Sequence, residues 1–126
     1  MTTPEQSAEI AASVRLDEES LDPSGVVLTV SGELDIGTAP QLRARLTAAI
    51  DAGVNRLVID LCPLDFMDSI ALAVMLQART RLGDAGRMAV VVAPDSYTRL
   101  IFEVAGMPHC IEVFETRQQA IAHVAG

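Results

Sequence analysis

The chain has 126 residues, a length typical of one domain, and half of them are hydrophobic but only 3% aromatic, which predicts an aliphatic core. Its formal net charge is -8, and its nine basic residues are all Arg. The acidic balance argues against a nucleic-acid binder, because such proteins neutralise phosphates with a basic patch. The absence of Lys excludes a Schiff-base Lys, a phosphate-loop Lys and a typical phosphate-accepting response-regulator domain.

Two cysteines, Cys62 and Cys110, lie too far apart in sequence for a metal knuckle or a redox pair. We interpret them as reduced, semi-buried thiols of a cytoplasmic protein. No segment reaches the roughly 20 apolar residues of a membrane span, and the N-terminus lacks the pattern of a signal peptide. Residues 1–12 are expected to form a mobile tail, with a short helix as the alternative, ahead of a single domain at 13–126.

The first half of the domain reads as two strands and a helix. Polar residues alternate with Val14 and Leu16, which predicts an edge strand, and a turn follows at 21–25, where Pro and Gly favour reversal. A strand is expected at 26–31 and a loop at 32–37. Thr38, with Gln41 three residues later, predicts a capping box at the start of a helix that ends at Gly53.

The second half alternates strands and helices. Strands are predicted at 56–61, 87–93 and 110–114, with a loop at 62–68 and a helix at 69–83. A further helix begins near Ser96 and ends at Gly106; its apolar residues Tyr97, Leu100, Ile101 and Val104 share one face. Thr116 and Gln119 predict a capping box before a terminal helix. This order indicates an α/β domain with a four- to five-stranded, mixed but mostly parallel sheet and about four helices.

One residue at a loop-to-helix junction carries the main functional hypothesis. Ser69 follows Asp68 and precedes the predicted helix, so its hydroxyl could accept from the first-turn amides as an N-cap. The alternative is a phosphorylation site, since a phosphate of about -1.5 to -2 charges is well accommodated at a helix N-terminus. Spacing alone favours the cap.

The helix after Ser69 has two faces on a 100° projection. One is expected to pack on the sheet and the other to point outward. The inward set is Ala71, Leu72, Met75, Leu76, Ala78 and Leu82, and the outward set is Ile70, Ala73, Val74, Gln77 and Arg81. The outward apolar residues are either scattered surface residues or a docking patch beside Ser69, and both interpretations remain open.

Three segments of the chain resemble a known family. They are GELDIGTAPQL at 32–42, LVIDLCPLDFMDSIALAVML at 57–76 and the stretch 98–121. They look like the signature regions of the STAS domain, and within that family the anti-sigma factor antagonists of bacterial partner-switching systems. The resemblance covers most of the chain from the first strand onward.

The resemblance implies a mechanism. In that family a GHKL-type serine kinase, which is also an anti-sigma factor, phosphorylates the Ser that follows the Asp of the FMDS segment, here Ser69. The unmodified antagonist binds the anti-sigma factor and frees the sigma factor, the phosphorylated form releases it, and a phosphatase restores it. Asp35 and Asp68 match family positions beside the phosphoacceptor. The partner-binding set is therefore expected to comprise Asp35, Asp68, Ser69, Ile70, Ala73, Val74 and Gln77.

The sequence departs from the family pattern directly after Ser69. Ile70 replaces a hydroxyl residue, and Ala71 replaces a Gly and is expected to add a β-carbon where a partner approaches. A second hypothesis is therefore a STAS module that binds a partner without phosphorylation, in a stress-signalling or lipid-transport assembly. An exposed Ile70/Val74 patch could also mediate a homodimer.

Catalytic and metal sites have little support in the sequence. Asp60, Asp65 and Asp68 lack a coordinating loop pattern, and His109 and His123 have no partner at ligand spacing. No nucleophile elbow or glycine-rich phosphate loop is present in the sequence. We therefore expect neither an enzyme nor a cofactor, and no nucleic-acid or membrane partner.

Overall fold

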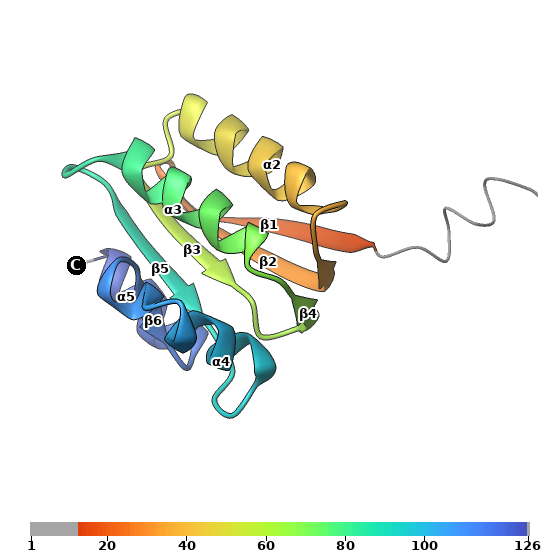
Figure 1. Cartoon of the computed structure of the whole chain (residues 1–126). Helices are drawn as coiled ribbons and strands as arrows, with labels where there is room; N and C mark the ends of the chain where they lie inside the picture. The colour runs from red at the N-terminus through yellow and green to blue at the C-terminus, as the bar shows by residue number, and fades with distance from the viewer. Residues whose placement is uncertain (1–12, 126) are drawn as a thin grey trace, which may run out of the picture.

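A computed structural model describes residues 13–125, so the expected tail at 1–12 lies outside the described residues. The elements follow one another along the chain in Figure 1. In order they are β1 (Val14–Asp22), β2 (Gly25–Leu34), α2 (Ala39–Asp51), β3 (Arg56–Asp60), β4 (Leu64–Met67), α3 (Ile70–Leu82), β5 (Arg87–Val91), α4 (Tyr97–Val104), the 3-10 turn η1 (Met107–His109), β6 (Glu112–Phe114) and α5 (Arg117–Ala125).

The sheet confirms the predicted α/β class. Its strand order is β1-β2-β3-β5-β6, β1 is antiparallel to β2, and the other pairs are parallel. The described residues form six strands, one more than expected, because 64–67 is a short strand rather than a loop. This strand, β4, pairs in parallel with the end of β2 and leaves the main path of the sheet. The last strand begins at Glu112 and not at Cys110, because the amides of Cys110 and Ile111 donate to the Met107 carbonyl and close the 3-10 turn.

Each face of the sheet carries its own apolar cluster. Alternate residues of β3 point to opposite sides: Leu57 and Ile59 join the larger cluster, and Val58 joins the smaller one. Helices α2 and α3 lie side by side over the first face (Figure 1), whereas α5 packs on the second. The core is aliphatic, as predicted, with Phe102 as its largest fully buried side chain.

A polar contact anchors α5 to the second face. The Asp60 carboxylate is buried at the end of β3 and is bound by the Arg117 guanidinium, with Nη2 and Oδ2 3.0 Å apart. Arg117 also donates to the Thr29 hydroxyl at 2.6 Å and to Glu19 at 3.0 Å. A buried carboxylate is costly unless it is paired, so Asp60 has a structural role here.

Side-chain caps form at the starts of α4 and α5, and the one at α5 confirms the predicted capping box. The Ser96 hydroxyl accepts from the Arg99 amide at 3.0 Å. Thr116 and Gln119 form the reciprocal capping box, each backbone amide donating to the other's side-chain oxygen at 3.2 Å. The caps predicted for Thr38 and Ser69 are not formed, and both of these residues lie at the candidate site.

Candidate functional site

Strand pairing brings the ends of β2 and β4 to one edge of the sheet. Leu34 is paired in register with Met67, and the Asp68 amide donates to the Leu34 carbonyl at 3.0 Å. Asp35 and Asp68 each follow one of these paired residues directly, so residues 33 positions apart become neighbours. Ligand and partner sites commonly lie beyond the carboxyl ends of parallel strands.

Near its end, β2 contains a glycine that the fold requires, and the loop expected at 32–37 begins only after Leu34. Gly32 has φ +92°, and a β-carbon there would lie 2.4 Å from the Ser13 carbonyl oxygen. The pairing of β2 with β4 is also irregular between Gly32 and Glu33, which is typical of a bulge. The bulge turns the chain toward the edge where Asp35 lies.

Asp35 and Thr38 close this loop with internal hydrogen bonds. The Asp35 carboxylate accepts from the amides of Gly37 at 2.9 Å and Thr38 at 3.0 Å. The Thr38 hydroxyl donates to the Glu33 carbonyl at 2.8 Å and accepts from the Asp35 amide at 2.9 Å. Thr38 is only 3% exposed, and its hydroxyl stabilises the loop through these two bonds. It does not cap α2, so the capping box predicted with Gln41 is not formed.

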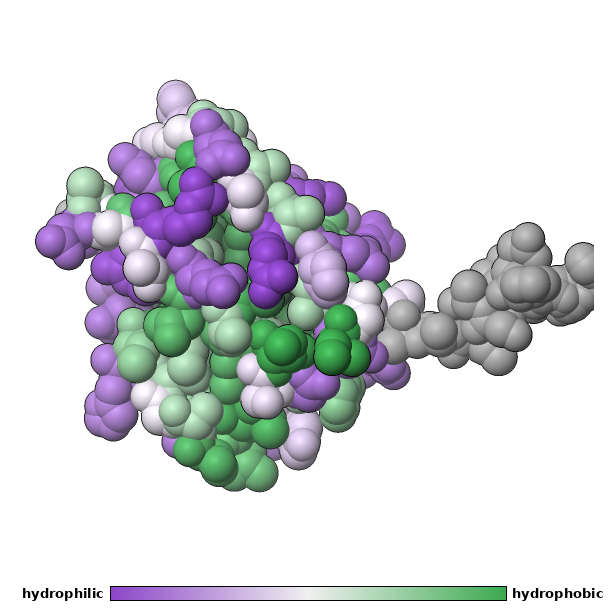
Figure 2. Space-filling model, turned by 45° about the horizontal axis from the view of Figure 1, so that its top comes forward, coloured by the Kyte–Doolittle hydropathy of each residue, from purple (hydrophilic) through white to green (hydrophobic). Residues whose placement is uncertain are grey.

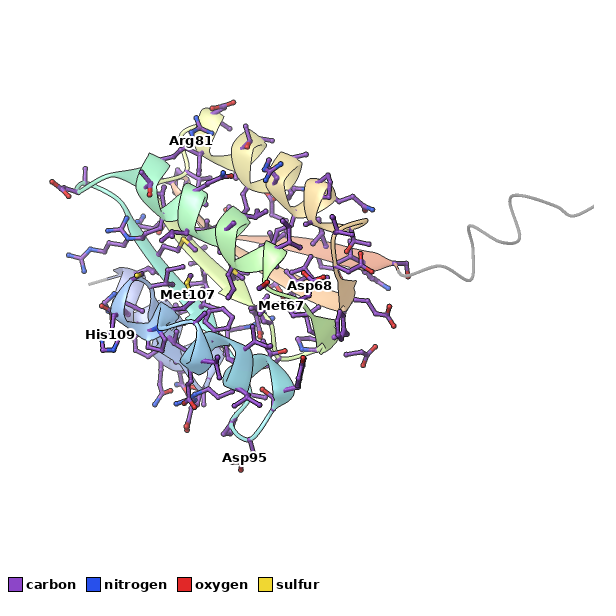
Figure 3. The ribbon with its side chains drawn as sticks, in the orientation of Figure 1. Met67, Asp68, Arg81, Asp95, Met107 and His109 are labelled. Carbon is purple, nitrogen blue, oxygen red and sulfur yellow. The ribbon has the colours of Figure 1, made fainter. Side chains whose placement is uncertain are left out.

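Asp68, not Ser69, caps α3. The Asp68 carboxylate accepts from the Ile70 amide at 2.9 Å, whereas the Ser69 side chain makes no cap hydrogen bond. Asp68 is labelled in Figure 3 at the junction between β4 and the first turn of α3. The structural role that spacing favoured for Ser69 is therefore wrong. Ser69 is an exposed residue at the helix N-terminus whose hydroxyl is not needed by the cap.

The outward face of α3 differs from the prediction at two positions. Ile70, Ala73, Gln77 and Arg81 are exposed as expected, but Val74 is 2% exposed and Leu76 is 38% exposed. The reason is that α3 packs on α2 as well as on the sheet, which buries a wider arc than the sheet alone would. Val74 lines a groove between these helices with Leu46 and Ile50.

The exposed apolar face of α3 consequently includes Leu76 and excludes Val74. An open hollow of about 530 Å³ lies over it. Its lining residues are Ala73, Leu76, Gln77, Thr80 and Arg81. Arg81 marks the far end of α3 from Asp68 (Figure 3) and forms an ion pair with Asp51 of α2 at 2.7 Å. The face therefore runs along α3 from the Ser69 edge to this ion pair.

Comparison with known families decides the classification. The profile of the STAS domain matches residues 17–120, which is most of the chain. The chain belongs to the STAS domain family.

This STAS domain is similar in sequence to curated relatives, and in fold to solved structures, that carry related names. It is 30% identical over 106 residues to the anti-sigma-F factor antagonist RsfB of Mycobacterium tuberculosis, covering 83% of this chain and 86% of the relative. An anti-sigma factor antagonist from Mycobacterium paratuberculosis has a crystal structure with a TM-score of 0.83, 25% identity and full coverage of both chains. SpoIIAA, an anti-sigma factor antagonist, was solved in its unphosphorylated form, with a TM-score of 0.75, 28% identity, and coverage of 89% of this chain and 97% of that one.

Ala71, one of the two departures from the family pattern, lies in the core of this STAS domain. It is fully buried in the larger apolar cluster, so its β-carbon faces the sheet and does not meet a partner. The expectation that it alters the docking surface is wrong. Ile70 is exposed and is the departure that changes that surface.

The other polar groups near the carboxyl edge are structurally engaged. Burial raises the pKa of the Cys62 thiol to about 11, with a smaller contribution from Asp60, so Cys62 stays neutral at neutral pH. Asp60 accepts from the Cys62 amide and from Arg117. As whole residues both cysteines are exposed and not semi-buried as predicted, although the Cys62 sulfur is partly desolvated.

Residues 13–125 lack a cluster of metal ligands and a helix that could span a membrane. This part of the STAS domain contains no group of three potential ligands that could hold a metal ion. Within the same residues, none of the helices combines the length and the apolar character needed to cross a bilayer.

Proposed function

We propose that this STAS domain is an anti-sigma factor antagonist whose contact with its partner is switched off by phosphorylation of Ser69. The protein is a regulator and not an enzyme. Its partner is an anti-sigma factor that is also a GHKL-type serine kinase, and a phosphatase restores the binding form. The observation that carries the proposal is Ser69 itself, which is exposed, uncommitted to the cap and placed at a helix N-terminus.

The electrostatics of the edge support a switch. Asp68 precedes Ser69 directly, and Asp35 follows the β2 residue that pairs with Met67, so both carboxylates belong to the edge that carries Ser69. A phosphate would add about -1.5 to -2 charges to this acidic edge. A partner that presents an acidic group to this edge would then face a like charge, which costs several kcal/mol, and a complete switch in population requires about 5.5 kcal/mol of differential affinity. One modification is therefore of the right size.

Partner contacts in this proposal come from both helix starts and from α3. Asp35 lies at the end of β2 and the exposed Ile36 follows it, while Ser69, Ile70, Ala73 and Gln77 line the start and exposed face of α3. Leu76 replaces Val74 in this set because it is exposed. The set combines an apolar stripe with carboxylates, which suits recognition by charge as well as by burial.

The first test is phosphorylation by the cognate kinase. Wild-type protein incubated with kinase and ATP should gain the mass of one phosphate, and Ser69→Ala should gain none. Ser20→Ala removes an exposed hydroxyl on β1 and is the matched control, which should be modified like the wild type. An equal mass gain in wild type and Ser69→Ala would exclude Ser69 as the acceptor.

The second test is binding. By calorimetry with the unmodified anti-sigma factor, phosphorylated protein should bind at least about 100-fold more weakly than unmodified protein, which corresponds to roughly 2.7 kcal/mol. Equal affinities of the two forms would refute the switch.

A second candidate function is supported by Ile70. This apolar residue stands exposed directly after Ser69, where the resemblance leads one to expect a hydroxyl, and it changes the surface that a kinase would contact. In this alternative the protein is a STAS interaction module that is not phosphorylated. It predicts no mass gain with kinase, and a Ser69→Glu variant that binds its partner with wild-type affinity.

A further inference from the structure

Helix α4 carries an exposed apolar stripe that the contacts around Ser69 do not include. The exposed fractions of Tyr97, Leu100 and Val104 are 56%, 53% and 78%. Their spacing of three and four residues places them along one side of the helix, whereas Phe102 and Thr98 are buried beneath it. We call Tyr97, Leu100 and Val104 the α4 stripe. Exposed apolar residues that form a continuous surface are typical of interaction sites.

The α4 stripe is joined to the Ser69 edge by an aromatic contact. The rings of Phe66 and Tyr97 are stacked, with centroids 6.1 Å apart and planes inclined by 17°. Phe66 is a partly exposed residue of β4 and lies two residues before Asp68. Figure 2 shows hydrophobic residues gathered over the lower part of the visible surface and hydrophilic ones over the upper part. The apolar surface therefore extends from the start of α3 across β4 to α4.

The rim of the α4 stripe is acidic. A hollow of about 440 Å³ beside Leu100 is lined by Asp95, Glu103, Glu115 and Arg99. Arg99 is shared between two of these carboxylates, at 2.9 Å from Glu103 and 3.6 Å from Glu115. Three carboxylates and one guanidinium leave the hollow with a negative charge. Asp95 lies at the tip of the loop that leads into α4 (Figure 3).

The negative charge of the rim decides which of three candidates can bind the α4 stripe: a second copy of the chain, the segment 1–12 or another protein. A second copy would bring one acidic rim against another, and each chain has a net charge of -8. The segment 1–12 contains Glu5 and Glu9 and no Arg, so it too would be repelled by the rim. A partner surface that presents apolar side chains flanked by Arg or Lys complements both the stripe and its rim.

We infer that the α4 stripe is a second docking surface for the anti-sigma factor, and that it receives an apolar segment of that partner flanked by basic residues. The inference rests on the proposed function. Binding is then bipartite: the Ser69 edge responds to phosphorylation, while the α4 stripe adds affinity that does not depend on it. The stacked Phe66 and Tyr97 rings keep the two parts in one continuous footprint.

The test is the affinity of the anti-sigma factor for a variant with Leu100→Gln and Val104→Gln. Both residues are exposed, so the unfolding midpoint should stay close to wild type, while affinity falls at least about tenfold, or roughly 1.4 kcal/mol. Leu21→Gln changes an exposed Leu on β1 and is the matched control with unchanged affinity. Asp95→Asn should slow association while leaving dissociation unchanged, as expected for a rim charge.

Phosphorylated protein measured in the same assay separates the two proposals. Wild-type affinity in the double variant, with binding that is still lost on phosphorylation, would overturn the docking surface and leave the proposed function intact. No binding of the anti-sigma factor to unmodified wild type would overturn both. Tighter binding after deletion of residues 2–12, or a homodimer abolished by the double variant, would assign the α4 stripe to the segment 1–12 or to a second copy and overturn the inference.

Discussion

Helices α2 and α3 begin after strand ends that are directly paired, yet the two helix starts are built differently. Before α2, the side chains of Asp35 and Thr38 are both engaged in bonds to the loop's own backbone, and Thr38 is buried. Before α3, Asp68 alone makes the cap and Ser69 is exposed with its hydroxyl outside it. At the start of α2, both side chains therefore stabilise the loop. At the start of α3, the Ser69 hydroxyl is held at the helix N-terminus but makes no bond that the cap requires. A residue that is modified and restored must be dispensable to the fold, and Ser69 meets that condition.

The largest effect should come from Gly32, which sets the course of the chain into the first junction. Gly32→Ala should lower the free energy of unfolding by about 3 kcal/mol, the upper end for a strained backbone residue, because a β-carbon would meet the Ser13 carbonyl. Gly53→Ala is the control: φ is also positive there, at +103°, but nothing lies within 4 Å of the added carbon. Urea denaturation should show the smaller loss for Gly53→Ala. An equal decrease in the free energy of unfolding for both variants would mean that the contact with the Ser13 carbonyl does not cause the destabilisation.

Removing the Thr38 hydroxyl should have the next largest effect. Thr38→Val keeps the shape of the side chain but leaves the Asp35 amide and the Glu33 carbonyl without their partner, which should cost about 2 kcal/mol. Thr38→Ser keeps the hydroxyl and loses only a buried methyl, at about 1 kcal/mol. If denaturation showed Thr38→Ser to be less stable than Thr38→Val, the hydrogen bonds of the hydroxyl would not be what stabilises the loop.

The sequence predicted the repeating parts of the fold well. Apolar runs and alternation placed the strands, and glycines placed the ends of α2 and α3, because burial on a sheet imposes a simple period. β4 was missed since four residues with two exposed side chains carry no clear alternation. Val74 and Leu76 were exchanged because a period describes one buried face, whereas α3 is buried by the sheet and by α2 together.

At the candidate site, the sequence did not predict the hydrogen-bonding roles of the polar residues at the two helix starts. Each helix start offers an Asp and a hydroxyl residue that can both accept amide bonds, and spacing cannot decide between them. In both cases the carboxylate accepts the amides of the turn. The remaining hydroxyl is then free to be buried in a loop, as Thr38 is, or left exposed, as Ser69 is. That choice depends on how β2, β4 and the helices meet.

An intermediate effect is expected at Asp68, the residue that caps α3. Asp68→Ala should lower the free energy of unfolding by about 1 kcal/mol, the usual cost of losing an N-cap oxygen. Asp68→Asn retains an oxygen at the same place and should lie within a few tenths of a kcal/mol of wild type. Chemical denaturation of the three proteins provides the comparison. A loss in Asp68→Asn as large as in Asp68→Ala would show that the charge, and not the cap bond, stabilises this junction.

The smallest effect should be that of Ser69→Ala. A serine that caps a helix costs about 1 kcal/mol when replaced by Ala, whereas an exposed side chain without such a bond changes stability by less than about 0.5 kcal/mol. Ser96→Ala is the internal standard, because Ser96 occupies the same position before α4 and does accept the Arg99 amide. Denaturation should therefore separate the two serines: Ser96→Ala loses about 1 kcal/mol and Ser69→Ala stays near wild type. An equal decrease in the free energy of unfolding for the two variants would mean that the Ser69 hydroxyl stabilises the fold. The two helix starts would then not differ, and the proposed switch would modify a hydroxyl that the fold needs.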